Sequence, residues 1–330
     1  MAGANRTGQV KIGLLQLPCG EDREENLRRA IEAAEAAADQ GAQILCFQEL
    51  FASRYFCQTE DARFFDWAEP VSGPAIARLR RLAARRKIAL IAPFFERRAP
   101  GLCHNSAAVI DADGSLLGLY RKVHIPDDPQ FHEKFYFAPG DLGFRAWRTR
   151  YGAIGVLICW DQWFPEAARL TAMAGAQILF CPTAIGWLPG EKEGEGRRFQ
   201  EAWRTIQRAH AIANGCFLAA VNRVGFEPVP AGPEALRAQE SASRRGIEFW
   251  GSSFVAGPLG ELLAEAPEDC PALLLAEADL SRIERVRAQW PFFRDRRPEA
   301  YKGLGRLFGE SAGLSSGPLS GETSRREGGA

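Results

Sequence analysis

The sequence lacks an excess of charge of either sign. Its 41 Lys and Arg residues balance 41 Asp and Glu residues, so the formal net charge is zero at neutral pH. A neutral protein has no general electrostatic attraction for nucleic acid or for an anionic membrane surface. Any partner must therefore be recognised by a local site. We predict a small-molecule substrate, with neither nucleic acid nor a membrane as a partner.

Long apolar runs are also missing. Stretches such as residues 154–160 are far shorter than the roughly 18 to 20 residues that a membrane-spanning helix requires. The first eight residues are polar and contain no apolar core of the roughly 7 to 15 residues found in secretion signals. Together these absences predict a cytoplasmic protein.

No C-x-x-C pair occurs among the eight cysteines. In an intracellular chain of this length, such spacing indicates neither a disulfide framework nor a zinc finger. We therefore expect most of the cysteines to be small buried apolar residues.

Apolar runs typical of strands alternate with helical patterns along the chain. Asp111-Ala-Asp-Gly114 is a strong signal for a hairpin turn, so antiparallel pairs interrupt the β-α order. This mixture predicts an α/β fold, a four-layer α-β-β-α sandwich with two mixed β-sheets. The expected strands are 10–17, 44–47, 88–95, 105–110, 116–124, 144–148, 153–159, 177–181 and 217–221, followed by a hairpin around 258–260. The expected helices are 23–39, 73–87, one starting at Pro165, and 197–213.

No internal linker interrupts residues 10–302, so we predict one domain over residues 9–302. The polar residues 1–8 are expected to be disordered. From residue 303 the composition changes to Gly, Ser, Glu and Arg, which predicts a flexible tail over 303–330.

Three chemically reactive side chains occur at predicted strand ends. Cys159 ends a buried strand just before a helix, where backbone N–H groups can stabilise an oxyanion. Glu49 and Lys122 end two other strands. Each residue alone has an ordinary explanation: a buried cysteine, an exposed glutamate and an edge lysine. The four histidines do not occur in a recognisable cysteine-protease setting, so a carboxylate is the alternative base.

Taken together, these residues resemble the Glu-Lys-Cys triad of the nitrilase superfamily of carbon–nitrogen hydrolases. The resemblance extends over nearly the whole chain, from Val10 to Pro298. Four local motifs carry it: Phe-Gln-Glu-Leu-Phe at 47–51, Tyr-Arg-Lys-Val-His-Ile-Pro at 120–126, the segment 133–141, and Ile-Cys-Trp-Asp-Gln-Trp-Phe-Pro-Glu at 158–166.

The resemblance implies the same α-β-β-α sandwich, assembled as a homo-oligomer, either a dimer or larger. It implies that Glu49 is the general base, that Cys159 is the nucleophile and forms a thioester, and that Glu133 is a supporting glutamate. Lys122 and the backbone N–H of Trp160 would stabilise the oxyanion. Lys122 should also favour the thiolate form of the cysteine. No metal and no cofactor are required.

The residues after the nucleophile also indicate the substrate. Relatives that hydrolyse N-carbamoyl amino acids place arginines there to bind a carboxylate, whereas this chain has Gln162 and Trp163. An amine-bearing or neutral substrate with a ureido or amide end is therefore favoured. We expect Trp160, Gln162, Trp163, Tyr55 and Trp187 to contribute to the substrate pocket.

One departure from the most similar subgroup concerns the distal amine. Trp187 and Leu188 stand where a Ser-Glu pair is usual, so another acid must bind an ammonium group. The candidates are Asp127, Asp128, Glu191 and Glu193. Two alternatives remain open at this point: an ω-amidase or aliphatic amidase of the same family, and an inactive oligomeric scaffold.

Overall fold

The structure, a computed structural model, describes residues 8–230 and 245–308. The chain divides into two units, residues 1–292 and 293–330, and the first unit carries the sheets described below. This unit ends before residue 302, the domain boundary predicted from the sequence. The predicted disordered start and most of the predicted tail lie outside the described residues. Among the described helices, none is long and apolar enough to cross a membrane.

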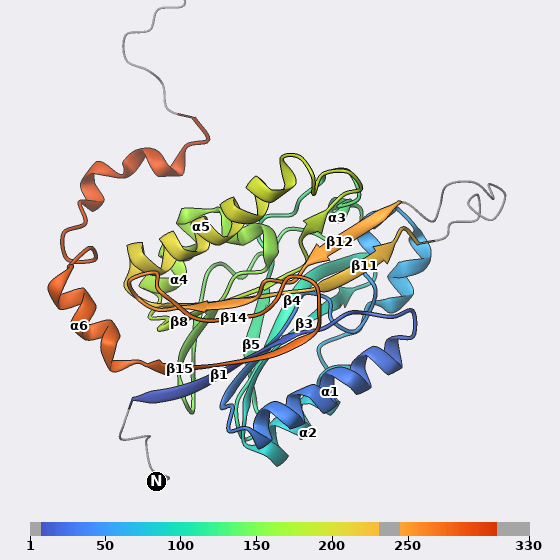
Figure 1. Cartoon of the computed structure of the whole chain (residues 1–330), viewed down its shortest axis with the longest axis horizontal. Coiled ribbons are helices and arrows are strands. Elements are labelled where there is room, and N and C mark those ends of the chain that lie inside the picture. Colours follow the sequence, from blue (N-terminus) through green and yellow to red (C-terminus); the bar gives the residue numbers. More distant parts are fainter. Residues whose placement is uncertain (1–7, 231–244, 309–330) are drawn as a thin grey trace, which may run out of the picture. The chain divides into compact units, whose positions relative to one another are not determined.

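The first sheet has six strands in the order β15-β1-β2-β3-β4-β5. Strands β1, β2 and β3 run parallel to one another. Strand β15 pairs antiparallel with β1, β4 pairs antiparallel with β3, and β5 pairs antiparallel with β4. Helices α1 (Arg23–Asp39) and α2 (Pro74–Arg86) cover one face of this sheet (Figure 1). The strands are β1 (Gln9–Gln16), β2 (Ile44–Phe47), β3 (Ala89–Ala99), β4 (Leu102–Ile110), β5 (Leu116–Arg121) and β15 (Ala272–Asp279).

The second sheet also has six strands, in the order β14-β13-β10-β8-β7-β6. Strands β7, β8 and β10 run parallel. Helices α4 (Pro165–Met173) and α5 (Gly196–Asn214) cover its outer face (Figure 1). The strands are β6 (Ala146–Thr149), β7 (Gly152–Val156), β8 (Ile178–Thr183), β10 (Phe217–Asn222), β13 (Phe254–Ala256) and β14 (Leu262–Glu265).

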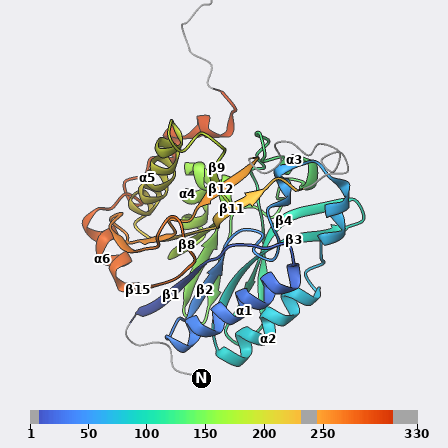
Figure 2. The same cartoon turned by 45° about the vertical axis from the view of Figure 1, so that its right-hand side comes forward.

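A small third sheet has the order β11-β12-β9. It lies at the same end of the sandwich as the short helix α3 (Glu133–Tyr136), as Figure 2 shows. Its strands are β9 (Gly186–Trp187), β11 (Val224–Pro228) and β12 (Gly246–Trp250), and helix α6 (Ser281–Gln289) follows β15.

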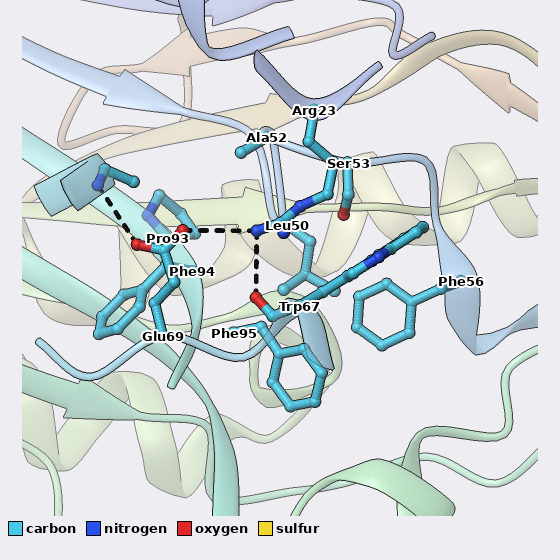
Figure 3. Close-up of a pocket in the computed structure, with 11 residues that line it drawn as sticks. Arg23, Leu50, Ala52, Ser53, Phe56, Trp67, Glu69, Pro93, Phe94 and Phe95 are labelled. Carbon is cyan, nitrogen blue, oxygen red and sulfur yellow. Dashed lines mark hydrogen bonds and ion pairs between the residues drawn. The ribbon is translucent and has the colours of Figure 1, made fainter. Parts of the chain in front are cut away.

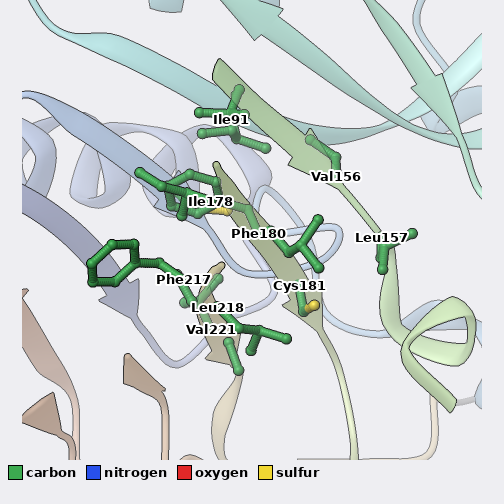
Figure 4. Close-up of a cluster of buried hydrophobic side chains, with 14 of the residues drawn as sticks. Ile91, Val156, Leu157, Ile178, Phe180, Cys181, Phe217, Leu218 and Val221 are labelled. Carbon is green, nitrogen blue, oxygen red and sulfur yellow. The ribbon is translucent and has the colours of Figure 1, made fainter. Parts of the chain in front are cut away.

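The two large sheets pack face to face because their strands alternate apolar side chains between two cores. In β1, Ile12 and Leu14 belong to the core between the sheets, whereas Leu15 packs toward the helices. Strand β3 behaves likewise, with Ile91 between the sheets and Leu90 beneath the helices. Figure 4 shows the inter-sheet core around Ile91, with side chains of β7, β8 and β10. The predicted four-layer sandwich is confirmed.

Several elements were not predicted from the sequence. Strands β9, β11 and β12 are between two and five residues long, too short for a clear alternation. Helix α6 buries only Ile283 and Val286, so its apolar stripe is weak. The strand predicted over 153–159 ends at Val156, because the backbone turns before Cys159.

The inter-sheet core should dominate stability. We expect Phe180→Ala to lower the free energy of unfolding by about 3–5 kcal/mol, because it leaves a cavity between tightly packed sheets. Leu259→Ala is the control, since Leu259 is 50% exposed and its truncation should change stability by less than about 0.5 kcal/mol. Urea denaturation of both variants measures the difference, and equal losses would contradict this account of the core.

Candidate active site

The reactive side chains predicted from the sequence meet between the two large sheets. Glu49 follows the end of β2 and Lys122 follows β5, both in the first sheet. Cys159 begins a short 3₁₀ segment, Cys159–Trp163, after β7 of the second sheet. Strand ends are where an α/β fold leaves room for a binding site. The sandwich therefore brings together residues that are far apart in the sequence.

Lys122 lies between two carboxylates. Its Nζ donates to Oε1 of Glu49 at 2.9 Å and to Oε2 of Glu133 at 2.7 Å. All three side chains are fully buried, at 0% exposure. Tyr55 donates its hydroxyl to the other oxygen of Glu133, Oε1, at 2.7 Å. The ion pairs therefore hold Lys122 in one orientation, shielded from water.

The two oxygens of Glu49 have different surroundings. Oε1 accepts from Lys122 and also from Nδ2 of Asn105, at 2.7 Å. Oε2 is buried and has no hydrogen-bond partner within the described residues. A buried carboxylate oxygen without a donor is costly, and it is available to accept a proton. Oε2 is thus the oxygen suited to a general base.

Asn105 was not singled out from the sequence. It lies in β4, is fully buried, and its carbonyl accepts from the backbone N–H of Lys122 at 2.9 Å. It therefore contacts both the base and the lysine. Two further polar residues, His104 and Ser106, flank it in the strand of residues 102–110, so no local sequence signal distinguishes Asn105.

Cys159 occupies a strained turn. Its φ is +46°, a left-handed conformation that costs energy for a residue other than glycine. The side chain is buried, with Sγ 3.9 Å from the carbonyl oxygen of Ala184. This turn separates the thiol from the strand that precedes it and places it at the edge of the sheet.

Burial, and next to it the negative charge of Glu49, raises the pKa of the Cys159 thiol well above its ordinary value. Lys122 acts in the opposite direction but does not prevail. Lys122 therefore favours the thiolate, as expected from the sequence, but burial and Glu49 outweigh it. Burial alone would lower the pKa of Lys122, but Glu133 and Glu49 raise it, so the lysine is charged.

The position of Lys122 is supported from behind. Arg121 donates from Nε and Nη2 to the two oxygens of Glu96, both at 2.7 Å. The N–H of Gly140 donates to the carbonyl oxygen of Lys122 at 2.7 Å. A Cβ atom at Gly140 would lie 2.1 Å from the carbonyl oxygen of Arg121, so only glycine fits there. This explains the glycine in the Pro-Gly-Asp sequence at 139–141.

A cavity of about 520 Å³ opens in front of Cys159. Glu133 and Cys159 form its inner end, and aromatic rings form much of its wall. Within residues 8–230 and 245–308, the charged residues that line it are all acidic, namely Asp128, Glu133 and Glu191. The other lining residues are Pro126, Pro129, Phe131, Trp160, Trp163, Ala184, Ile185, Gly186, Leu188, Phe199 and Trp250.

The cavity contains some of the predicted pocket residues. Trp160 and Trp163 line it. Tyr55, Gln162 and Trp187 are buried outside the lining. Tyr55 contacts Glu133, as described above, and Gln162 accepts through Oε1 from Thr183 Oγ1 at 3.0 Å. Trp187 packs against Trp250, with ring centroids 5.4 Å apart.

The four acids considered for binding a distal ammonium group differ in whether they line the cavity. Asp128 and Glu191 line the cavity. Glu193 lies outside the lining, and Asp127 pairs with His132 at 3.7 Å instead. Three aromatic wall residues, Phe131, Phe199 and Trp250, were not predicted, because they come from segments with no recognised motif.

A second hollow lies beside the segment that follows Glu49. It has a volume of about 30 Å³ and is lined by Leu50, Ser53 and Trp67, among others. Figure 3 shows Arg23 on its wall, donating to Glu69 and to the Trp67 carbonyl. The volume suffices for about two water molecules and is too small for a substrate.

Comparisons with known proteins agree with this geometry. The family model for carbon-nitrogen hydrolase matches residues 11–288. An N-carbamoylputrescine amidase of Solanum tuberosum is 45% identical over 94% of this chain and 99% of the relative. A citrullinase of Francisella tularensis is 39% identical over 91% of this chain and 99% of the relative.

Among solved structures, a carbon-nitrogen hydrolase from Helicobacter pylori superimposes with a TM-score of 0.85. It is 47% identical, and the match covers 91% of this chain and 99% of that one. This likeness confirms the fold described above. The chain therefore belongs to the carbon–nitrogen hydrolase family, the nitrilase superfamily, whose members include enzymes for amides and ureides.

Proposed function

We propose that this enzyme hydrolyses N-carbamoylputrescine to putrescine, carbon dioxide and ammonia through a thioester on Cys159. The observation that carries the proposal is the charge of the cavity, whose charged lining residues are all acidic in the part of the chain that the structure describes. Lys122 neutralises Glu133 at the inner end, which leaves Asp128 and Glu191 for a cation. The similar amidase from Solanum tuberosum acts on N-carbamoylputrescine, which is a ureide with a distal ammonium group.

The first half-reaction begins with proton transfer. Oε2 of Glu49 accepts the thiol proton while Sγ of Cys159 attacks the ureido carbon, which forms a C–S bond. Nζ of Lys122 and the N–H of Trp160 stabilise the tetrahedral oxyanion. Glu49 then returns the proton to the departing nitrogen. The C–N bond breaks, ammonia leaves, and a carbamoyl thioester remains on the cysteine.

Water completes the reaction. The carboxylate of Glu49 removes a proton from a water molecule, which attacks the thioester carbon and restores the thiol. The product is a carbamate, which loses carbon dioxide to give the free amine. Because Lys122 is held by two carboxylates, it stabilises both oxyanions without moving.

The distal ammonium has a defined place in this arrangement. Oε2 of Glu191 accepts from the N–H of Leu188 at 2.7 Å, which orients the carboxyl group. Trp187 contributes indirectly, since Lys192 and Arg197 lie over its ring at 4.7 and 4.8 Å and hold this segment. Trp187, which with Leu188 stands in place of the usual Ser-Glu pair, therefore supports the loop that carries Glu191. The aromatic wall accommodates the methylene chain between the two ends of the substrate.

Citrulline fits the cavity less well. It shares the ureido group but adds a carboxylate beside the amine. Among the described residues that line the cavity there is no Lys or Arg to bind that carboxylate. The absence of a Lys or Arg among these residues also disfavours an ω-amide with a terminal carboxylate. A short aliphatic amide has no cation that could pair with Asp128 and Glu191.

Steady-state kinetics with matched substrates tests this proposal. We expect Asp128→Asn and Glu191→Gln to raise the KM for N-carbamoylputrescine by about 10- to 100-fold, the effect of losing one charge-assisted hydrogen bond. Neither variant should affect turnover of butylurea, which has the same ureido end but no ammonium group. Glu193→Gln is the matched control from the same loop. Wild-type enzyme that turned over butylurea as efficiently as N-carbamoylputrescine would refute the assigned substrate.

The assigned roles also predict the results of two substitutions at the reacting groups. Cys159→Ala and Glu49→Gln should each abolish ammonia release from N-carbamoylputrescine while the circular dichroism spectrum is unchanged. Mass spectrometry of the rapidly quenched wild-type enzyme should show the substrate minus ammonia added to Cys159. Ammonia release by Cys159→Ala at the wild-type rate would remove the cysteine from the mechanism.

The protonation state of the thiol can be measured by alkylation with iodoacetamide. Because burial and Glu49 raise the thiol pKa, the thiolate forms only as the pH rises, so the rate should still be increasing above about pH 9. Glu49→Gln removes the second cause and should move the midpoint to lower pH, although turnover is lost. A wild-type rate that levelled off below about pH 8 would instead indicate a thiolate stabilised by Lys122.

A further inference from the structure

A second fully buried ion pair lies behind the active site. Arg223 follows β10 and is 0% exposed, and its Nη1 pairs with Oε1 of Glu227 in β11 at 2.6 Å. Neither residue lines the substrate cavity, and the hydrolytic steps above do not use them. Burying two charges is costly, so the contacts of this pair must be examined.

The contacts of Arg223 converge on the segment that carries the general base. Nη2 donates to the carbonyl oxygens of Glu49 and Leu50, both at 3.0 Å. Nη1 also donates to the carbonyl oxygen of Ser53 at 2.8 Å. Three backbone carbonyls of one short turn thus face a single guanidinium group. Only an arginine offers enough donors in a fixed plane for this arrangement.

The turn needs such a partner because its backbone is irregular. Leu50 has a φ of +50°, so the carbonyls of this segment do not continue the hydrogen bonding of β2. Buried carbonyl groups without partners would destabilise the turn. The carbonyl oxygen of Leu50 accepts one bond from the N–H of Ser53 at 3.2 Å, and Arg223 supplies further donors from the other side of the sandwich, since β10 belongs to the second sheet and β2 to the first.

Glu227 extends the same support to the other catalytic carboxylate. Its Oε2 accepts from the backbone N–H of Tyr55 at 2.6 Å. Tyr55 in turn donates its hydroxyl to Glu133, which binds Lys122. The ion pair therefore fixes both ends of residues 49–55, and this segment carries Glu49 at one end and the partner of Glu133 at the other.

We propose that Arg223, paired with Glu227, is a positioning residue for hydrolysis, which holds residues 49–55 so that Glu49 and Lys122 are in register with Cys159. This inference rests on the roles proposed for Glu49 and Cys159. Arg223 touches neither the substrate nor the reacting atoms and acts through the backbone of the base. A displacement of that backbone slows proton transfer while the cavity that binds the substrate is unchanged.

The experiment compares kcat with KM in Arg223→Lys, which keeps the charge but cannot reach all four acceptors. We expect kcat to fall about 10- to 100-fold, the effect of a small misplacement of a catalytic group. KM should stay within about threefold of the wild-type value, because the cavity residues are untouched. Iodoacetamide should still label Cys159 stoichiometrically, which shows that the site is folded.

Two further variants exclude a merely structural effect. Leu79→Ala opens a cavity in the outer core beneath α2, removes none of the hydrogen bonds of the pair, and should lower the melting temperature without changing kcat. Glu227→Gln keeps an acceptor for the Tyr55 N–H but removes the charge that pairs with Arg223. It should also lower kcat at constant KM, and it carries the test if Arg223→Lys does not fold.

The outcomes are distinguishable from failure of the proposed function. Wild-type kcat in a folded Arg223→Lys or Glu227→Gln variant overturns the proposal. The proposal also fails if these variants lose no more kcat than Leu79→Ala does when their melting temperatures fall by the same amount. If the wild-type enzyme hydrolyses another amide rather than N-carbamoylputrescine, the substrate assignment fails, and kcat for that amide decides the role of Arg223. Full activity of Glu49→Gln would overturn both proposals.

Discussion

The site depends on one buried ammonium group shared by two buried carboxylates. Lys122 bonds to Glu49 and Glu133, and none of the three side chains reaches water. Two potential negative charges against one positive charge leave the site short of a cation, and burial, opposed by Lys122, raises the pKa of Glu133. Burial, and after it the negative charge of Glu49, raises the pKa of the Cys159 thiol. In the proposed mechanism, activation of the nucleophile therefore coincides with attack, when the thiol proton moves to Glu49 and the oxyanion develops beside Lys122.

Such a site works only if the surrounding backbone cannot relax, and hydrogen bonds or close packing from other segments hold the turns that carry these residues. Arg223 holds the turn after β2, and Gly140 fits against the turn after β5. Asp161 joins the turns of the lysine and the cysteine, since it accepts from Tyr120 and from the N–H of His124 at 2.6 and 2.8 Å. These anchors cross between segments far apart in the chain. The sandwich thus provides more than a scaffold, because its two sheets hold the two halves of the site.

The sequence predicted what depends on local pattern. Helix 23–39 and strand 44–47 were located at their observed bounds, because apolar periodicity and caps mark them. The resemblance to a family singled out Glu49, Lys122, Glu133 and Cys159, of which the two glutamates bond to the lysine. Sequence reasoning did not predict Asn105, Arg223 or Glu227. Each acts through a contact with a distant segment, and no local sequence pattern marks such a contact. Trp187 was expected to line the substrate pocket, but Trp250, which packs against it, lines the cavity instead.

The acidic residues of this site divide according to their access to water. Glu49 and Glu133 are enclosed, where a carboxylate without a partner is costly. Asp128 is exposed and Glu191 is partly so, and both therefore remain in contact with water. A substrate with a neutral ureido group at one end and an ammonium group at the other matches this gradient. The uncharged end can enter the dehydrated region without the cost of desolvating an ion, and the charged end stays near solvent beside the acids. Reversing such a substrate would bury its charge next to Lys122, so the distribution of exposure along the cavity sets the direction of binding.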